Sequence, residues 1–142
     1  MERGELPGFL QLGRREEAAA RVEEFLEQSP KDIGGNLTAM QSLLAAAAGD
    51  RTLAEQKIRH AIQIGEGYQH FHHTAYIIGS SYALMNELEP ALRFLRQAAE
   101  EGFPCYPLFE RDPNLKNLRS DPHFVQFMAD LKKQWEYYGA KL

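Results

Sequence analysis

Three segments of the chain carry the same triplet of residues, and this repeated spacing constrains the fold more than any other feature. In each triplet the second residue follows the first by four positions and the third follows three later, so all three share one face of an α-helix. Successive triplets begin 36 and 37 residues apart. They are Ala18, Val22 and Phe25; Ala54, Ile58 and Ala61; and Ala91, Leu95 and Ala98. A repeat of this length predicts an all-α chain of packed helix pairs.

Residues that end helices separate the predicted helices. Gly13, Gly49 and Asn86 each precede a triplet, and such residues adopt the left-handed conformation that closes a helix. Pro30 follows the first unit and Pro104 the third. Because proline cannot continue a helix, both mark the end of a unit.

The third unit has the fullest pattern. Its positions are Ile78-Gly79, then Tyr82, then Ala91 with Leu95 four residues on, and finally Pro104. This pattern resembles the tetratricopeptide repeat family. The resemblance covers roughly residues 9–104 and implies a right-handed helix-turn-helix solenoid of about two and a half repeats, with units near 9–30, 36–64 and 72–104.

The chain also departs from the family pattern. Ala75 stands where the family prefers Trp. The second unit has Gln41-Ser42 where the third has Ile78-Gly79, and Ala45 where the third has Tyr82. Pro7-Gly8 lies among the few residues before Gly13, so the first helix of the first unit is expected to be short or missing. In the third unit, Gly79 is expected to let two helices nest closely, while large side chains fill the groove between them.

Residues 105–142 form a different, aromatic-rich segment. Asp112-Pro113 and Asp121-Pro122 each predict a helix start, because Asp caps the free amides and Pro fits the first helical position. The second helix carries one apolar face, made of Phe124, Phe127, Met128, Leu131 and Trp135. We expect it to cap the open end of the repeat stack.

This segment resembles the ends of repeat arrays in bacterial proteins. The resemblance rests on Gly102-Phe103, Asp112-Pro113-Asn114-Leu115 and Asp121-Pro122-His123-Phe124. It implies the C-terminal end of a larger array or a short free-standing member. A lone helix or a truncated helix pair is expected over about 8–28. The other helices expected are 36–48, 52–64, 72–85, 89–101, 113–119 and 122–138.

Composition favours one compact domain over residues 1–142. With 142 residues, 44% of them hydrophobic, the chain can form a single core. The net charge of −4 argues against a nucleic-acid partner. No apolar run reaches the length of a membrane span, and residues 1–5 lack a signal core, so a cytoplasmic protein is expected. The lone Cys105 requires no oxidising compartment.

The family resemblance implies a concave groove lined by the first helix of each pair. The groove residues would be Asn36, Ala39, Met40, Leu43 and Ala47 of the second unit and His73, Tyr76, Ile77, Ser80 and Leu84 of the third. Because this lining is mostly apolar, we expect a non-catalytic adaptor or scaffold that binds an apolar peptide or helix. A clamp for the free C-terminal carboxylate of a peptide is disfavoured, because it needs Lys, Arg and Asn at matching positions of successive first helices and only Asn36 is present. Alternatively, Met40, Leu43, Tyr76 and Ile77 pack against the chain's own terminal segments.

Two other functions remain as alternatives. In the first, a homodimer covers the open face left by the incomplete first unit. In the second, a metal-dependent enzyme uses His70, His72 and His73. The second is the weaker, because a catalytic metal site needs three converging ligands and the chain lacks the His-Glu-x-x-His spacing. No cofactor is expected.

Overall fold

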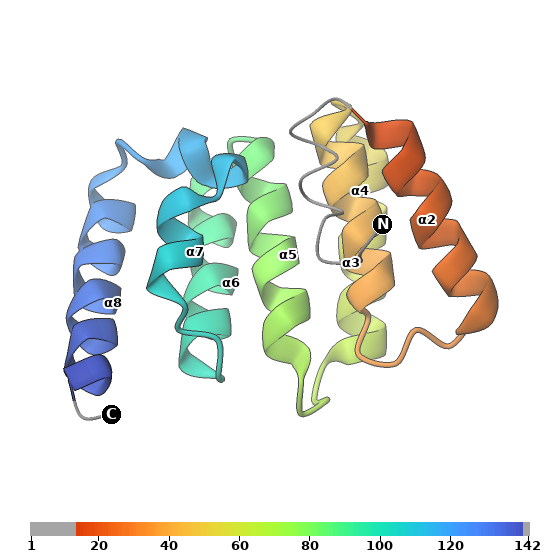
Figure 1. Ribbon diagram of the computed structural model, residues 1–142. Helices are drawn as coiled ribbons and strands as arrows, with labels where there is room; N and C mark the ends of the chain where they lie inside the picture. Colours follow the sequence, from red (N-terminus) through yellow and green to blue (C-terminus); the bar gives the residue numbers. More distant parts are fainter. Residues whose placement is uncertain (1–13, 141–142) are drawn as a thin grey trace.

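The computed structural model describes residues 14–140, and over that range every regular element is helical (Figure 1). The elements are α2 (Arg15–Gln28), α3 (Asn36–Ala47), α4 (Arg51–Gly65), α5 (Phe71–Leu84), α6 (Leu88–Glu100), α7 (Tyr106–Arg111), the 3₁₀ helix η2 (Pro113–Leu118) and α8 (Pro122–Ala140). The all-α class is confirmed, and most predicted boundaries lie within two residues of those observed. The expected helix at 8–28 is observed from Arg15 onwards, and its earlier residues lie outside the described range.

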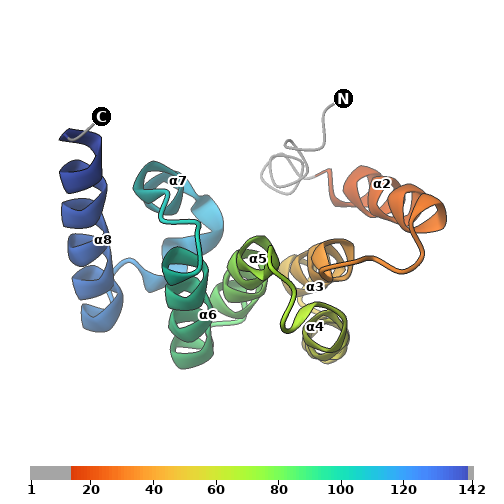
Figure 2. The ribbon, with the colours of Figure 1, turned by 90° about the horizontal axis from the view of Figure 1, so that it is seen from below.

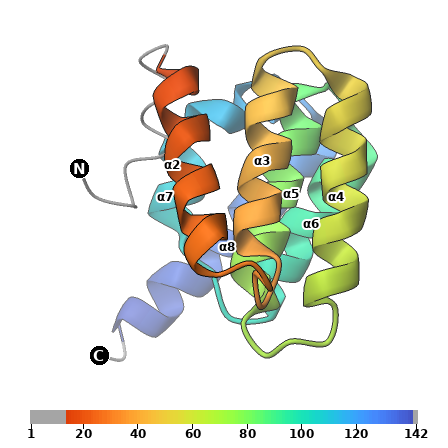
Figure 3. The same ribbon diagram turned by 90° about the vertical axis from the view of Figure 1, so that its right-hand side faces the viewer.

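Helices α3 to α6 form two antiparallel hairpins that lie side by side (Figures 1 and 3). Viewed along the helices, α2 and α7 lie on one side of the α3–α5 pair, and α4 and α6 lie on the other (Figure 2). The closing turns of α3 and α5 match, because Gly49 and Asn86 are 37 residues apart and have positive φ angles of 83° and 62°. The predicted breaks at these two residues are confirmed, and Gly13 lies outside the described range.

Small residues set the distance between α5 and α6. A Cβ atom added to Gly79 would lie 2.9 Å from Leu95 Cγ and 3.1 Å from the Ala91 carbonyl oxygen. Leu95, Ala91 and Ala98 are all fully buried. Tyr82 is half-buried and stacks on Phe94 with ring centroids 5.9 Å apart. The predicted close nesting of these two helices is therefore confirmed.

Hydroxyl groups join the two hairpins at the α3–α5 contact. The hydroxyl oxygens of Ser42 and Ser81 lie 2.9 Å apart, so one of the two hydroxyls donates to the other. The hydroxyl that accepts this bond donates to a carbonyl of its own helix, that of Ala39 for Ser42 or that of Ile77 for Ser81. Nearby, Thr74 Oγ1 donates to the Gly34 carbonyl oxygen at 2.7 Å. These bonds satisfy polar groups that would otherwise destabilise a buried contact.

Loop residues fix the ends of the hairpins. Asp32 is buried and accepts hydrogen bonds from the Leu37 and Thr38 amides and from the Thr38 hydroxyl, which caps the start of α3. At the opposite end, Arg51 donates to Glu87 at 2.8 Å and to the Met85 carbonyl at 2.7 Å. Each hairpin is thus tied to its neighbour at the loops as well as in the core.

The C-terminal segment continues the same core. One hydrophobic cluster runs from Ala39 in α3 to Leu131 in α8, and it includes the fully buried Phe109, Leu115 and Leu118. Both predicted Asp-Pro starts are confirmed, since Asp112 Oδ1 accepts from the Asn114 amide and Asp121 Oδ2 from the Phe124 amide.

Two details of this segment differ from expectation. Helix α7 was not predicted, because its six residues are too few to show periodicity, although Pro107 near its start is a recognisable signal. The predicted apolar face of α8 covers the core through Phe124, Phe127 and Leu131, whereas Trp135 is 44% exposed. Among residues 14–140 no helix combines the length and apolarity needed to cross a bilayer.

Replacing Gly79 by Ala tests the close approach of α5 and α6. We expect the free energy of unfolding to fall by roughly 1–2 kcal/mol, because the overpacking penalty exceeds the gain in helix propensity. Urea denaturation followed by circular dichroism measures the change. The control is Gly139→Ala in α8, where an added Cβ meets nothing within 4 Å and no loss is expected. Equal stability of Gly79→Ala and wild type would show that this contact is not tight.

Candidate functional site

The ten residues predicted to line a groove fall on α3 and α5 as five pairs separated by 37 positions. The two members of each pair have the same degree of burial. Asn36 and His73 are exposed; Ala39 and Tyr76 are buried; Met40 and Ile77 are half-buried; Leu43 and Ser80 are buried; Ala47 and Leu84 are half-buried. Helices α3 and α5 therefore present equivalent faces.

Four of these residues lie in the interior, which corrects their prediction as ligand contacts. Ala39, Leu43, Tyr76 and Ser80 are between 0% and 8% exposed. The Ser80 hydroxyl donates to the Tyr76 carbonyl at 3.0 Å. A ligand on this face would meet the half-buried and exposed positions instead.

Tyr76 is held by the chain's own C-terminal segment, as the alternative in the sequence analysis proposed for it. Its hydroxyl donates to Asp112 Oδ2 at 2.6 Å. Its ring lies 4.9 Å from that of Phe109 and 5.5 Å from that of Phe103. Burial, and then the neighbouring Asp112 carboxylate, raise the pKa of Tyr76 far above its usual value. Tyr76 therefore stays protonated and donates to Asp112.

The half-buried residues of this face form the remaining candidate surface. Met40 packs beside Val22 of α2, while Ile77 and Leu84 pack against the main cluster with part of each side chain accessible. Asn36 and His73 mark the N-terminal ends of the two helices. The surface is thus a narrow apolar strip with one polar group at the start of each helix.

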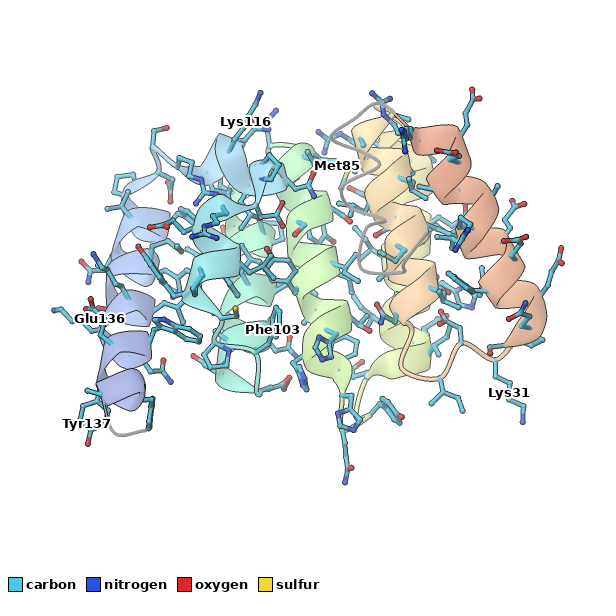
Figure 4. All side chains as sticks on the ribbon, viewed as in Figure 1. Lys31, Met85, Phe103, Lys116, Glu136 and Tyr137 are labelled. Carbon is cyan, nitrogen blue, oxygen red and sulfur yellow. The ribbon has the colours of Figure 1, made fainter. Side chains whose placement is uncertain are left out.

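The histidines gather at the start of α5, where His70 is the residue just before the helix. Ring centroids lie 5.9 Å apart for His70 and His72 and 4.3 Å for His72 and His73. Phe103 lies against His73 at 5.1 Å and near Tyr76 (Figure 4). Desolvation, followed by repulsion from His72 and His70, lowers the pKa of His73. Protonation of His73 is therefore less favourable in the folded chain than in the unfolded chain.

The geometry of this cluster does not support the metal-enzyme alternative. Within the described residues, no group of three or more His, Cys, Asp or Glu side chains is placed to hold a metal ion. The three imidazoles instead make ring contacts with one another, and two of them also contact Phe103. Their arrangement is that of an aromatic cluster covering the start of α5.

Sequence reasoning did not identify three residues that shape the candidate face, namely Phe103, Phe109 and Asp112. All three lie in or next to the C-terminal segment, more than 25 positions from Tyr76. Asp112 was recognised only as a helix cap, a role it performs with its other carboxylate oxygen. No spacing rule connects such distant positions, so their contact with Tyr76 required the structure.

Comparison of the sequence with protein-family models gives no match, and neither the curated proteins nor the solved structures include a significant match to the chain.

Removing the Tyr76 hydroxyl tests its role in holding the C-terminal segment. In Tyr76→Phe we expect a loss of about 1–3 kcal/mol of unfolding free energy, because Asp112 Oδ2 loses a buried hydrogen bond. Since the folded pKa is raised, wild type should also lose stability as the pH rises above about 10, and the variant should lose less. Urea unfolding at pH 7 and pH 10.5 measures both effects. The control is Tyr138→Phe on exposed α8, where no comparable loss is expected.

Titration of His73 should make the fold less stable in mild acid. Because its pKa is lowered in the folded chain, the unfolded chain binds a proton first as the pH falls below about 6.5, and stability declines. The melting temperature of wild type should therefore drop from pH 7 to pH 5 more steeply than that of His73→Gln. His60→Gln, at an exposed position of α4, is the control and should follow wild type. Parallel curves for wild type and His73→Gln would contradict this assignment.

Proposed function

We propose that this chain is a non-catalytic protein-binding module built from tetratricopeptide-like helical hairpins, acting as an adaptor or scaffold. The observation that carries the proposal is the matched burial of five residue pairs on α3 and α5. A repeated face that keeps accessible apolar atoms at equivalent positions suits an extended or helical segment that runs across both helices. Such ligands are recognised through apolar anchors at helical spacing.

The supporting geometry comes from the hairpins themselves. The turns within the two hairpins correspond, since α5 ends 37 residues after α3, at Leu84 and Ala47, and α6 begins 37 residues after α4, at Leu88 and Arg51. The buried triplet residues Ala54, Ile58 and Ala61 match Ala91, Leu95 and Ala98 in burial. Helix α2, with Ala18 and Val22 buried, supplies a single further helix at one end. These features favour a stack of about two and a half units, with α7, η2 and α8 as its C-terminal cap.

The candidate ligand surface is the half-buried part of the predicted groove. It consists of Met40, Ala47, Ile77 and Leu84, with Asn36 and His73 at its edge. An apolar peptide or the apolar side of an amphipathic helix would bury the exposed atoms of these side chains. The surface carries no cluster of cations, so a peptide carboxylate is a poorer ligand.

A peptide selected against the folded chain provides the test. Random 16-residue peptides would be selected by phage display on wild type, and binding of a selected peptide would be measured by fluorescence anisotropy. In a variant carrying Met40→Gln and Ile77→Gln we expect affinity to fall at least about tenfold, because two apolar contacts are lost. Circular dichroism and thermal melting would first establish that the variant folds.

The matched control carries Leu53→Gln and Leu88→Gln. Leu53 lies in the first turn of α4 and Leu88 is the first residue of α6, and these two helices lie on the other side of the α3–α5 pair (Figure 2). Each leucine is 39% exposed, so the control makes the same kind of change away from the candidate surface. Affinity in the control should stay within about twofold of wild type. Equal affinity in all three proteins, or an equal loss in both variants, would place the site elsewhere.

A further inference from the structure

The core uses only the first half of α8. Phe124, Phe127 and Leu131 are buried, whereas every residue from 132 to 140 is exposed. Helix α8 lies at the end of the row, and its second half extends past α7 (Figure 1). Glu136 and Tyr137 project from its outer side (Figure 4). This half of α8 is therefore an accessible helical surface.

A second stripe, apolar at Val125, Met128 and Trp135 and charged at Lys132, runs beside the buried face. Its residues alternate at steps of three and four and are Val125, Met128, Lys132, Trp135 and Gly139. Val125 is 53% exposed and Trp135 is 44% exposed. A Cβ atom added to Gly139 would meet nothing within 4 Å, so another backbone can approach there. This spacing is the one that lets two helices pack along their length.

The charged residues of α8, on the stripe and beside it, are balanced in sign. Helix α8 contains two acidic and two basic residues, Asp130, Lys132, Lys133 and Glu136, whereas the whole chain has a net charge of −4. Among the described residues, neither Lys132 nor Glu136 forms an ion pair within 4 Å. Because two copies of the chain repel each other overall, a neutral face is where they approach at the lowest electrostatic cost.

We propose that the stripe binds a second copy of this chain through antiparallel pairing of the two α8 helices. If the helices cross at the level of Gln134, two-fold symmetry places Lys132 opposite Glu136 of the partner subunit, and the same pair recurs on the other side of the axis. The overlap then extends from Met128 to Ala140, so Val125 lies outside it. Trp135 lies between the two pairs and becomes buried. Charge complementarity thus selects one antiparallel register.

The expected dimer is reversible. A single pair of helices buries less than the roughly 1,600 Å² of a standard interface, so we expect association in the micromolar range. Helix α8 is at the opposite end of the row from α2 and α3 (Figure 2), so pairing leaves the α3–α5 surface accessible. The inference does not depend on the proposed peptide-binding function.

Charge reversal tests the pairing. Sedimentation equilibrium of the full chain, from about 1 to 200 µM, gives the dissociation constant of the dimer. Lys132→Glu and Glu136→Lys should each weaken association at least about tenfold, because both symmetry-related pairs become like-charge contacts. In the double variant the dissociation constant should return to within about threefold of the wild-type value, because Glu at position 132 again faces a residue of opposite charge, Lys at position 136 of the partner subunit.

The matched control is Lys133→Glu, which makes the same charge change one position away from the stripe. Its dissociation constant should stay within about twofold of the wild-type value. Circular dichroism would establish equal helicity for all variants. A monomeric wild type over the whole range would overturn the proposal. So would a dimer insensitive to the single reversals, a double variant that stays weak, or a control that weakens as much as Lys132→Glu.

Discussion

Close approach of helix backbones is the constraint on which the rest of the structure depends. At Gly79 there is no room for even one extra carbon atom between α5 and α6. At Gly35 an added Cβ would lie 2.5 Å from the Ala61 carbonyl oxygen, so α4 also packs directly on the start of α3. Tight contacts bring small residues together, and aromatic side chains fill the space beside them, as Tyr82 and Phe94 do within the α5–α6 hairpin.

The aromatic side chains then connect the hairpins to the C-terminal segment. Phe103 and Phe109 surround Tyr76, and the Tyr76 hydroxyl reaches the carboxylate that also caps η2. One polar contact therefore joins the middle of α5 to the turn that orients η2 and α8. The same contact removes Tyr76 from the surface that a ligand could reach.

The sequence predicted the helices well because their information is local. Triplet spacing, left-handed residues at Gly49 and Asn86, and the Asp-Pro pairs each act within a few residues of the structure they determine. The candidate site was predicted less well because burial depends on distant partners. Spacing placed Tyr76 on the correct helix, yet only the folded chain brings Asp112 to it. Two of the predicted groove residues, Leu43 and Tyr76, therefore proved to be buried, which their spacing alone could not show.

Helix α2 is attached differently from the other helices. Its buried residues, Ala18 and Val22, form a small cluster of their own with side chains of α3, separate from the main cluster that runs from α3 to α8. Among residues 14–140, the main cluster contains no residue of α2, so separation of α2 from α3 leaves that cluster intact. Backbone amides of α2 should exchange with solvent through this local opening, at a lower free energy than amides of α5 and α6. The fold thus consists of a cooperative body and one end that unfolds first.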